Sequence, residues 1–314
     1  MTLQTHNRRR LFAAAIFLSL LCAAPTLARN AVEKTTRTVL LGETGVMVNV
    51  YEKSGGRVTF FAPHFNERNA SEAAREAVER NGGRLVEIES YDERGVPSRR
   101  LRFSLRGRSY DLDPNRVFTE NGRRCGVPPE AEAAVRSFAE GLLELILAGG
   151  GKRLRDGESF IVAVHNNADV DERSARDQAA DLTAAAFVKV GAHGPLSRGA
   201  FQGQAAGAYL SNQEADADNF VYLSTPQLIA PFAGRGFNVV VQKPAAELRG
   251  EGCGVDDGSL SVYAALQGIP YVCLEADASH GQLRQREMLE TVYGLLPKPP
   301  AGEPSNAAAQ GRRW

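Results

Sequence analysis

The apolar run at residues 160–164 constrains the fold more than any other stretch, because every position in it is apolar. A strand with a continuous hydrophobic run is buried on both faces, and such strands occur in sheets that helices cover on both sides. Further strand-like runs occur at residues 38–41, 46–51, 57–62, 85–88, 220–223, 236–241 and 269–275. Segments with helical spacing of apolar residues occur at 69–80, 128–147, 259–266 and 283–293.

The alternation of strands and helices predicts an α/β fold: a single domain with a central mixed or largely parallel sheet flanked by helices. No internal repeat or linker divides residues 29–296. Residues 99–105 alternate apolar and basic side chains, which predicts a half-exposed strand in a hairpin with residues 110–112. The polar, glycine-rich stretch from about 169 to 218 is expected to be loops and short elements that cover a site.

Residues 1–28 have the pattern of a secretory signal peptide. Three arginines at positions 8–10 precede an apolar run at 11–24, which is shorter than a membrane-spanning helix. Small side chains at Thr26 and Ala28 predict cleavage after Ala28, and an uncleaved membrane anchor is the alternative. We therefore expect a periplasmic or secreted protein.

Charge and composition exclude some partners of the mature chain. Without its first 28 residues the chain keeps 37 − 3 = 34 basic residues against 37 acidic ones. A net charge near −3 gives no general attraction to nucleic acid, and no later segment is apolar enough to span a bilayer. The tail at 297–314 is rich in Pro, Ala and Gly, and we expect it to be disordered.

Three cysteines follow the predicted signal peptide, and export would bring them into an oxidising compartment. Cys125 and Cys253 both lie in glycine-rich loops, so they are the candidate disulfide pair. Cys273 lies inside an apolar strand-like run, so we expect a buried free thiol there.

The run at residues 57–62 leads to a His-x-x-Glu motif, His64 to Glu67. Just past a strand end, this spacing can place an imidazole and a carboxylate on one side of a tight turn. They are two of the three protein ligands that a catalytic zinc needs. A surface turn with a helix-starting glutamate is the alternative. His165 follows another strand and can complete the set, or it can be structural.

Two further segments carry residues that can bind a substrate or take part in catalysis. Asn115 and Arg116 combine a directed amide donor with a planar fork that suits a carboxylate. A turn with a solvated arginine is the alternative. Glu275 ends an apolar run, where a carboxylate is costly to bury. Beside a metal it can transfer a proton from bound water to a leaving nitrogen, and the alternative is an ion pair with an arginine.

Taken in order, these motifs resemble those of the zinc carboxypeptidase superfamily, including its succinylglutamate desuccinylase/aspartoacylase branch. The resemblance spans about residues 57–290. It implies zinc held by His64, Glu67 and His165, with Glu275 as general base and acid. In such α/β sheets the ligand site lies at the carboxyl ends of the strands.

The resemblance also implies that Asn115 and Arg116 hold a substrate carboxylate. The family uses an upstream arginine to polarise the scissile carbonyl, and Arg102 is our choice among the candidates, with Arg100 and Arg106 as alternatives. The expected function is a secreted zinc hydrolase that cleaves an amide next to a free carboxylate in cell-wall or other peptides. An N-acyl amino acid deacylase and a non-catalytic protein that binds peptide termini are the alternatives.

Overall fold

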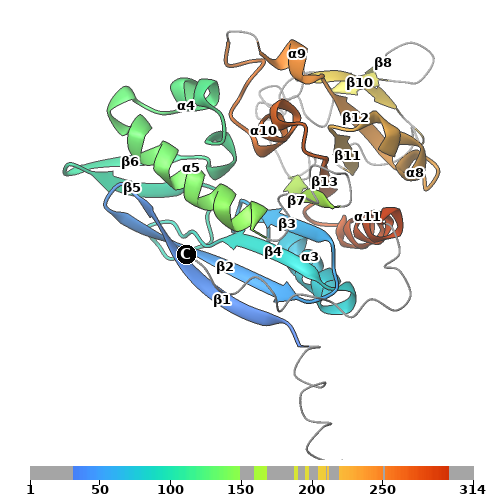
Figure 1. The fold of residues 1–314 in the computed structure, drawn as a ribbon, viewed down its shortest axis with the longest axis horizontal. Coiled ribbons are helices and arrows are strands. Elements are labelled where there is room, and N and C mark those ends of the chain that lie inside the picture. The colour runs from blue at the N-terminus through green and yellow to red at the C-terminus, as the bar shows by residue number, and fades with distance from the viewer. Residues whose placement is uncertain are drawn as a thin grey trace, which may run out of the picture.

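The computed structural model describes residues 31–148, 159–167, 187–189, 195–197, 204–209, 211, 219–249 and 252–296. They form a single α/β domain around a mixed nine-stranded sheet, in the order β1-β2-β4-β3-β7-β13-β11-β12-β10 (Figure 1). Its strands are β1 (Glu33–Leu41), β2 (Thr44–Lys53), β3 (Val58–Ala62), β4 (Gly83–Ile88), β7 (Phe160–Asn167), β10 (Ala205–Tyr209), β11 (Phe220–Leu223), β12 (Asn238–Gln242) and β13 (Tyr271–Asp277).

The centre of the sheet is parallel and its margins are mostly antiparallel. Strands β4, β3, β7 and β13 run parallel to one another, and β11 runs parallel to β12. The pairs β1–β2, β2–β4, β11–β13 and β10–β12 are antiparallel. The carboxyl ends of β3, β7 and β13 therefore lie side by side at one edge of the sheet.

Helices cover both faces of this sheet. They are α3 (Arg68–Asn81), α4 (Glu120–Gly126), α5 (Glu132–Leu147), α8 (Ile229–Ala233), α9 (Ala245–Leu248), α10 (Leu260–Gln267) and α11 (Gln282–Leu295). Figure 1 shows α5 on one face and α3 and α11 on the other. In α5, the buried residues Val135, Phe138, Ala139, Leu142 and Ile146 recur every three or four positions, which gives the helix one apolar side.

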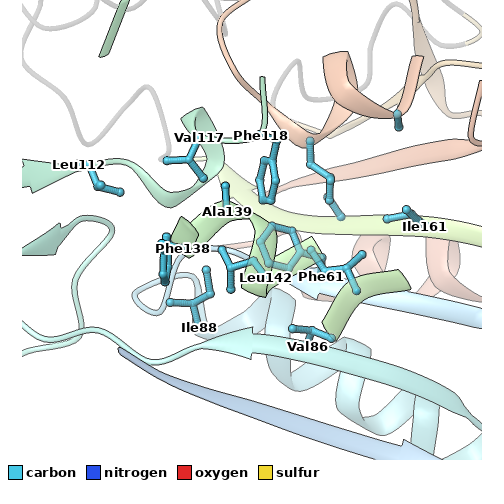
Figure 2. Packing of buried hydrophobic residues seen from close by; sticks show 14 of the residues in the cluster. Phe61, Val86, Ile88, Leu112, Val117, Phe118, Phe138, Ala139, Leu142 and Ile161 are labelled. Carbon is cyan, nitrogen blue, oxygen red and sulfur yellow. The ribbon is translucent and has the colours of Figure 1, made fainter. Parts of the chain in front are cut away.

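Two apolar cores result, one on each face. Phe61, Phe118 and Leu142 belong to the core under α5, which Figure 2 shows from close by. Alternate strand residues point to the opposite face, so Phe60 and Val162 pack with the alanines of α3 and with α11. Because β7 and β13 contribute to both cores, their ends are fixed from both sides.

Short elements outside the main sheet complete the fold. The predicted hairpin is confirmed as β5 (Leu101–Leu105) and β6 (Arg108–Leu112). A second small sheet pairs β8 (Phe187–Lys189) with β9 (Pro195–Ser197). The 3-10 turns are η2 (Pro114–Arg116), η3 (Pro129–Ala131) and η6 (Pro226–Leu228). The predicted helix at 128–147 is confirmed as η3 followed by α5.

Two expected strand ends are wrong. His165 and Glu275 lie inside β7 and β13, which continue to Asn167 and Asp277. The two strands pair in parallel through these last residues, with Glu275 beside His165 and Asp277 beside Asn167. Backbone pairing tolerates polar side chains, so the loss of apolar character did not mark the strand ends. The short helices α4, α8 and α9 had no periodic signal and were not predicted.

The predicted disulfide between Cys125 and Cys253 is confirmed, with Cα atoms 5.6 Å apart. Cys273 is a buried free thiol, as expected. Within the described residues, no helix is long and apolar enough to cross a membrane. The predicted signal peptide at 1–28, the tail at 297–314 and most of the stretch at 169–218 lie outside the described residues.

Candidate metal centre

The β3–α3 connection brings His64 and Glu67 to the carboxyl edge of the sheet. After β3 ends at Ala62, the chain makes a tight turn in which the Glu67 amide donates to the His64 carbonyl at 3.1 Å. Glu67 occupies the N-cap position of α3, but its side chain does not cap the helix. It is 5% exposed, so the alternative of a surface turn with a helix-starting glutamate is wrong.

Glu67 joins the two histidines through its two carboxylate oxygens. His64 Nδ1 lies 2.8 Å from Oε1, and His165 Nδ1 lies 3.0 Å from Oε2. The two imidazole rings are 5.0 Å apart between centroids. Ligand atoms of the three residues all lie within 4.8 Å of one another, and all three side chains are buried. The structure therefore brings together the three residues proposed as metal ligands.

Asp113 holds His64 from the other side. Its Oδ1 lies 2.9 Å from His64 Nε2, and the same oxygen accepts a hydrogen bond from the Asn115 backbone amide at 2.8 Å. A carboxylate on the far nitrogen fixes both the tautomer and the orientation of a metal-binding imidazole. No role was predicted for Asp113. The signal that could have found it is its place at the start of the motif that contains Asn115 and Arg116.

The donor set fits a divalent metal. When neutral His64 donates a hydrogen bond from Nε2–H to Asp113, its Nδ1 lone pair faces a Glu67 oxygen only 2.8 Å away. Two acceptors at this distance need a proton or a cation between them. Two imidazole nitrogens and one carboxylate, with room for a fourth ligand, are the donors of catalytic zinc sites.

The charges of this cluster favour a cation. Burial lowers the pKa of His64, but Glu67 and Asp113 together outweigh it and raise the pKa above its usual value. Burial alone would raise the pKa of Glu67, yet His64 and His165 hold it well below its usual range. The pKa of Asp113 is also low, because His64 outweighs burial. Both carboxylates therefore stay ionised next to the histidines.

Glu275 lies next to His165, its register partner on the neighbouring strand. Its side chain is buried, and burial raises its pKa, with a further contribution from Glu67. The Cys273 thiol donates to Glu275 Oε1 at 3.2 Å. A buried carboxyl group with a raised pKa accepts a proton more readily than an exposed one, as a catalytic base must.

The arginine that reaches the cluster is Arg99, and not Arg102. Arg99 Nη1 donates to Glu67 Oε1 at 2.7 Å, and its Nε lies 3.6 Å from Asp113 Oδ2. Arg102 points outward from β5 and pairs with Glu93, with half of its side chain exposed. The alternation of β5 explains this orientation, since its odd-numbered apolar residues face the core. Arg99 belonged to the predicted strand at 99–105, but it precedes β5, so its side chain does not follow the alternation of that strand.

The other two arginine candidates also lie away from the cluster. Arg100 pairs with Asp111 on β6, and half of its side chain is exposed. Arg106 lies in the β5–β6 turn with φ +52°, where its backbone amide donates to Glu43. Neither has a contact with the histidines or with Glu67 among the described residues.

Asn115 and Arg116 lie in η2, directly after Asp113, and the chain itself engages both side chains. The Leu260 amide donates to Asn115 Oδ1 at 3.2 Å, at the start of α10. Arg116 Nε lies 3.2 Å from Asp257 Oδ2, and about a third of the arginine side chain is exposed. Asp113, which contacts His64, immediately precedes η2, so Asn115 and Arg116 lie close in sequence to a residue of the candidate metal site.

The loop that carries Asp257 is closely packed against η2. Gly258 has φ +80°, and an added Cβ there would lie 2.4 Å from the Arg116 carbonyl oxygen. The Thr119 hydroxyl donates to Asp256 at 2.5 Å. The Cys125–Cys253 disulfide ties α4 to the start of the same loop. These contacts fix the position of Asp257 relative to Arg116.

No family model matches this sequence, and no curated protein matches it. Solved structures to which this chain is similar include a "putative metallopeptidase" from Shewanella denitrificans, at 13% identity and TM-score 0.38, covering 87% of this chain and 85% of that one. A "putative metallopeptidase" from Shewanella amazonensis has 12% identity and TM-score 0.36, covering 90% and 93%. An aspartoacylase family protein from Mesorhizobium loti has 13% identity and TM-score 0.34, covering 82% and 67%.

Proposed function

We propose that this protein is a zinc-dependent hydrolase that cleaves an amide bond next to a free carboxylate. The observation that carries the proposal is the buried cluster of His64, Glu67 and His165, with Glu275 beside His165. A protein that only binds peptide ends has no need for a buried carboxyl group of raised pKa next to such a cluster. This combination favours an enzyme.

His64, Glu67 and His165 would hold the metal, and Asp113 would keep the His64 ring in its ligating orientation. A bound zinc ion would supply Lewis-acid polarisation and lower the pKa of a water molecule to about 7. Glu67 also accepts hydrogen bonds from the Asn166 amide at 3.1 Å and from Arg99 at 2.7 Å. Its carboxylate is therefore fixed before any ligand arrives.

Glu275 is the proton carrier in this proposal. Its carboxylate would accept a proton from the attacking water and deliver it to the leaving nitrogen. Burial raises the pKa of Glu275, so its carboxylate accepts a proton more readily than an exposed carboxylate does. The Cys273 thiol, which donates to Oε1, restricts the orientation of the carboxylate.

Arg99 takes the role that the sequence analysis gave to Arg102. Its guanidinium lies against Glu67 and Asp113 and keeps about half of its surface exposed. A fixed cation beside the metal ligands can donate to the charge that develops on the carbonyl oxygen. In this proposal Arg99 stabilises that oxyanion.

The substrate carboxylate would bind to the clamp formed by Asn115 and Arg116. Arg116 keeps part of its surface exposed, and its fork suits a carboxylate. Peptides with a free C-terminus and N-acyl amino acids both place a carboxylate next to an amide. Export to the periplasm or beyond remains part of the proposal, and the Cys125–Cys253 disulfide supports it, since such bridges persist in oxidising compartments.

Glu275→Gln tests this function, because the amide keeps the size of the side chain and removes its basic group. We expect hydrolysis of C-terminally free peptides or N-acyl amino acids to fall about 10²–10⁴-fold while the metal stays bound. The same peptides with amidated C-termini serve as the substrate control. Wild-type protein that holds zinc but cleaves neither substrate class would contradict the proposal.

A further inference from the structure

A second group of metal-ligating side chains lies beside the first. His165, Cys273 and Glu275 each offer a ligand atom within 4.8 Å of the other two, and all three are buried. This group shares only His165 with the set of His64, Glu67 and His165. The proposed function uses Glu275 as a proton carrier and leaves Cys273 without chemistry of its own.

Strand pairing brings the three side chains together. Glu275 is the register partner of His165, because β7 and β13 run in parallel. Cys273 precedes Glu275 by two residues, so both side chains point to the same face of β13. The Cys273 thiol already contacts Glu275 Oε1 at 3.2 Å. The group therefore rests on rigid elements at the centre of the sheet.

The chemistry of the three ligands differs from that of the first set. An imidazole, a thiolate and a carboxylate are all zinc ligands, with bonds of about 2.0–2.3 Å. A tetrahedral site with such bonds holds its ligand atoms about 3.5 Å apart, so small side-chain rotations from the observed positions suffice. The sulfur ligand favours soft ions over hard ones.

We propose that His165, Cys273 and Glu275 form a second metal position, which binds a soft divalent ion such as Cd²⁺ or zinc supplied in excess. On binding, the Cys273 thiol releases its proton to solvent and ligates as the thiolate. The first set holds only nitrogen and oxygen ligands, so a metal–sulfur bond distinguishes the two positions. Because His165 belongs to both groups, the occupancy of one position affects the other.

Occupancy of the second position removes Glu275 from catalysis. A carboxylate that is bound to a metal ion cannot accept the proton of the attacking water. Excess soft metal should therefore inhibit the enzyme. This consequence rests on the proposed function, whereas the metal position itself does not.

Cobalt substitution tests the metal position without reference to activity. Co²⁺ bound to nitrogen and oxygen ligands gives weak visible bands, whereas a cobalt–thiolate bond adds a strong near-ultraviolet charge-transfer band. All proteins in the test carry Cys22→Ser, so Cys273 is the only thiol outside the disulfide. We expect this band when the purified full chain is titrated with Co²⁺.

Three variants separate the outcomes. Cys273→Ser and Cys273→Ala should abolish the band, and circular dichroism verifies that each has folded. His64→Ala removes a ligand of the first set only, so it should keep the band. No band in the wild-type chain at excess Co²⁺ would overturn the proposal, as would a band that survives loss of Cys273. A band that His64→Ala abolishes would also overturn it, because the sulfur would then belong to the first site.

Activity measurements test separately whether metal at the second position inhibits the enzyme. If the protein hydrolyses peptides, Cd²⁺ beyond one equivalent should inhibit the parent protein and not Cys273→Ser. If Cd²⁺ inhibited both proteins equally, inhibition would not come from metal bound at the second position. Absence of hydrolysis would count against the proposed function, while the cobalt band alone still decides whether the second position exists.

Discussion

The proposed metal cluster and the proposed carboxylate clamp differ in how their polar groups are engaged. In the cluster, one carboxylate, Glu67, contacts both histidines, Arg99 and the Asn166 amide. In the clamp, Asn115 Oδ1 and Arg116 Nε each contact the distant segment at 257–260. The cluster is preorganised for a cation, whereas the proposed substrate carboxylate would have to share Arg116 with Asp257. Metal affinity and substrate affinity should therefore respond to different substitutions.

The largest effect should come from removal of the disulfide, which tests the clamp. The bridge closes a loop with a sequence separation of 128. Loop-closure entropy assigns about 4–5 kcal/mol of unfolding free energy to a loop of this size. We expect Cys125→Ser with Cys253→Ser to lower the free energy of unfolding by up to this amount, measured by urea denaturation. The double variant should still bind one metal, because the cluster residues lie on other elements.

A control variant separates the effect of breaking the disulfide from the effect of replacing a cysteine by serine. Cys273→Ser removes the free cysteine and leaves the Cys125–Cys253 pair intact. Its unfolding free energy should change by less than that of the double variant. If the double variant lost its metal while still folded, the two regions would not be separable as we describe.

A middle-sized effect is expected from Asp113→Asn, which tests the cluster. The amide keeps the size of the side chain but weakens the interaction with His64 Nε2. Loss of such a partner typically lowers metal affinity about 10–100-fold. Competition with a chelator measures this change. Asp111→Asn, an exposed partner of Arg100 on β6, is the matched control and should leave metal affinity unchanged.

The smallest effect should come from Asp257→Asn. Asp257 pairs with Arg116 at 3.2 Å in a partly exposed site, and such pairs are worth about 0.2–1 kcal/mol. Removing the negative charge favours an anionic substrate, so KM for a carboxylate substrate should fall by up to about fivefold. Metal content should stay the same. A rise in KM would mean that Asp257 positions Arg116 rather than competing with the substrate.

Features that depend on short stretches of sequence were predicted correctly. The run before His64 identified a strand, and the spacing to Glu67 identified a turn that can present both side chains. The position of His165 beside them followed from a sheet with neighbouring parallel strands. The pairing of Cys125 with Cys253 was also predicted, since both lie in glycine-rich loops and we expected export to an oxidising compartment. The strand and the turn needed only the identity of nearby residues, whereas the sites of His165 and of the disulfide needed a general rule about parallel sheets or about cysteines in loops.

Contacts between distant segments were beyond sequence reasoning. Arg99 reaches Glu67 because of how the β5–β6 hairpin lies against the sheet edge, which no residue pattern specifies. The pairing of Arg116 with Asp257 depends on the close approach of η2 to Gly258. The link between Asp113 and His64 likewise joins residues 49 positions apart. Choosing Arg102 over Arg99 failed for this reason.

The most direct test of the central claim is the metal content of the purified protein, measured by elemental mass spectrometry. We predict about one zinc per wild-type chain after zinc is offered in stoichiometric amount and excess is removed. His64→Ala should contain none, while Arg116→Ala, in the clamp, should keep its zinc. A wild-type protein without metal, or a His64→Ala variant with undiminished metal, would contradict the account.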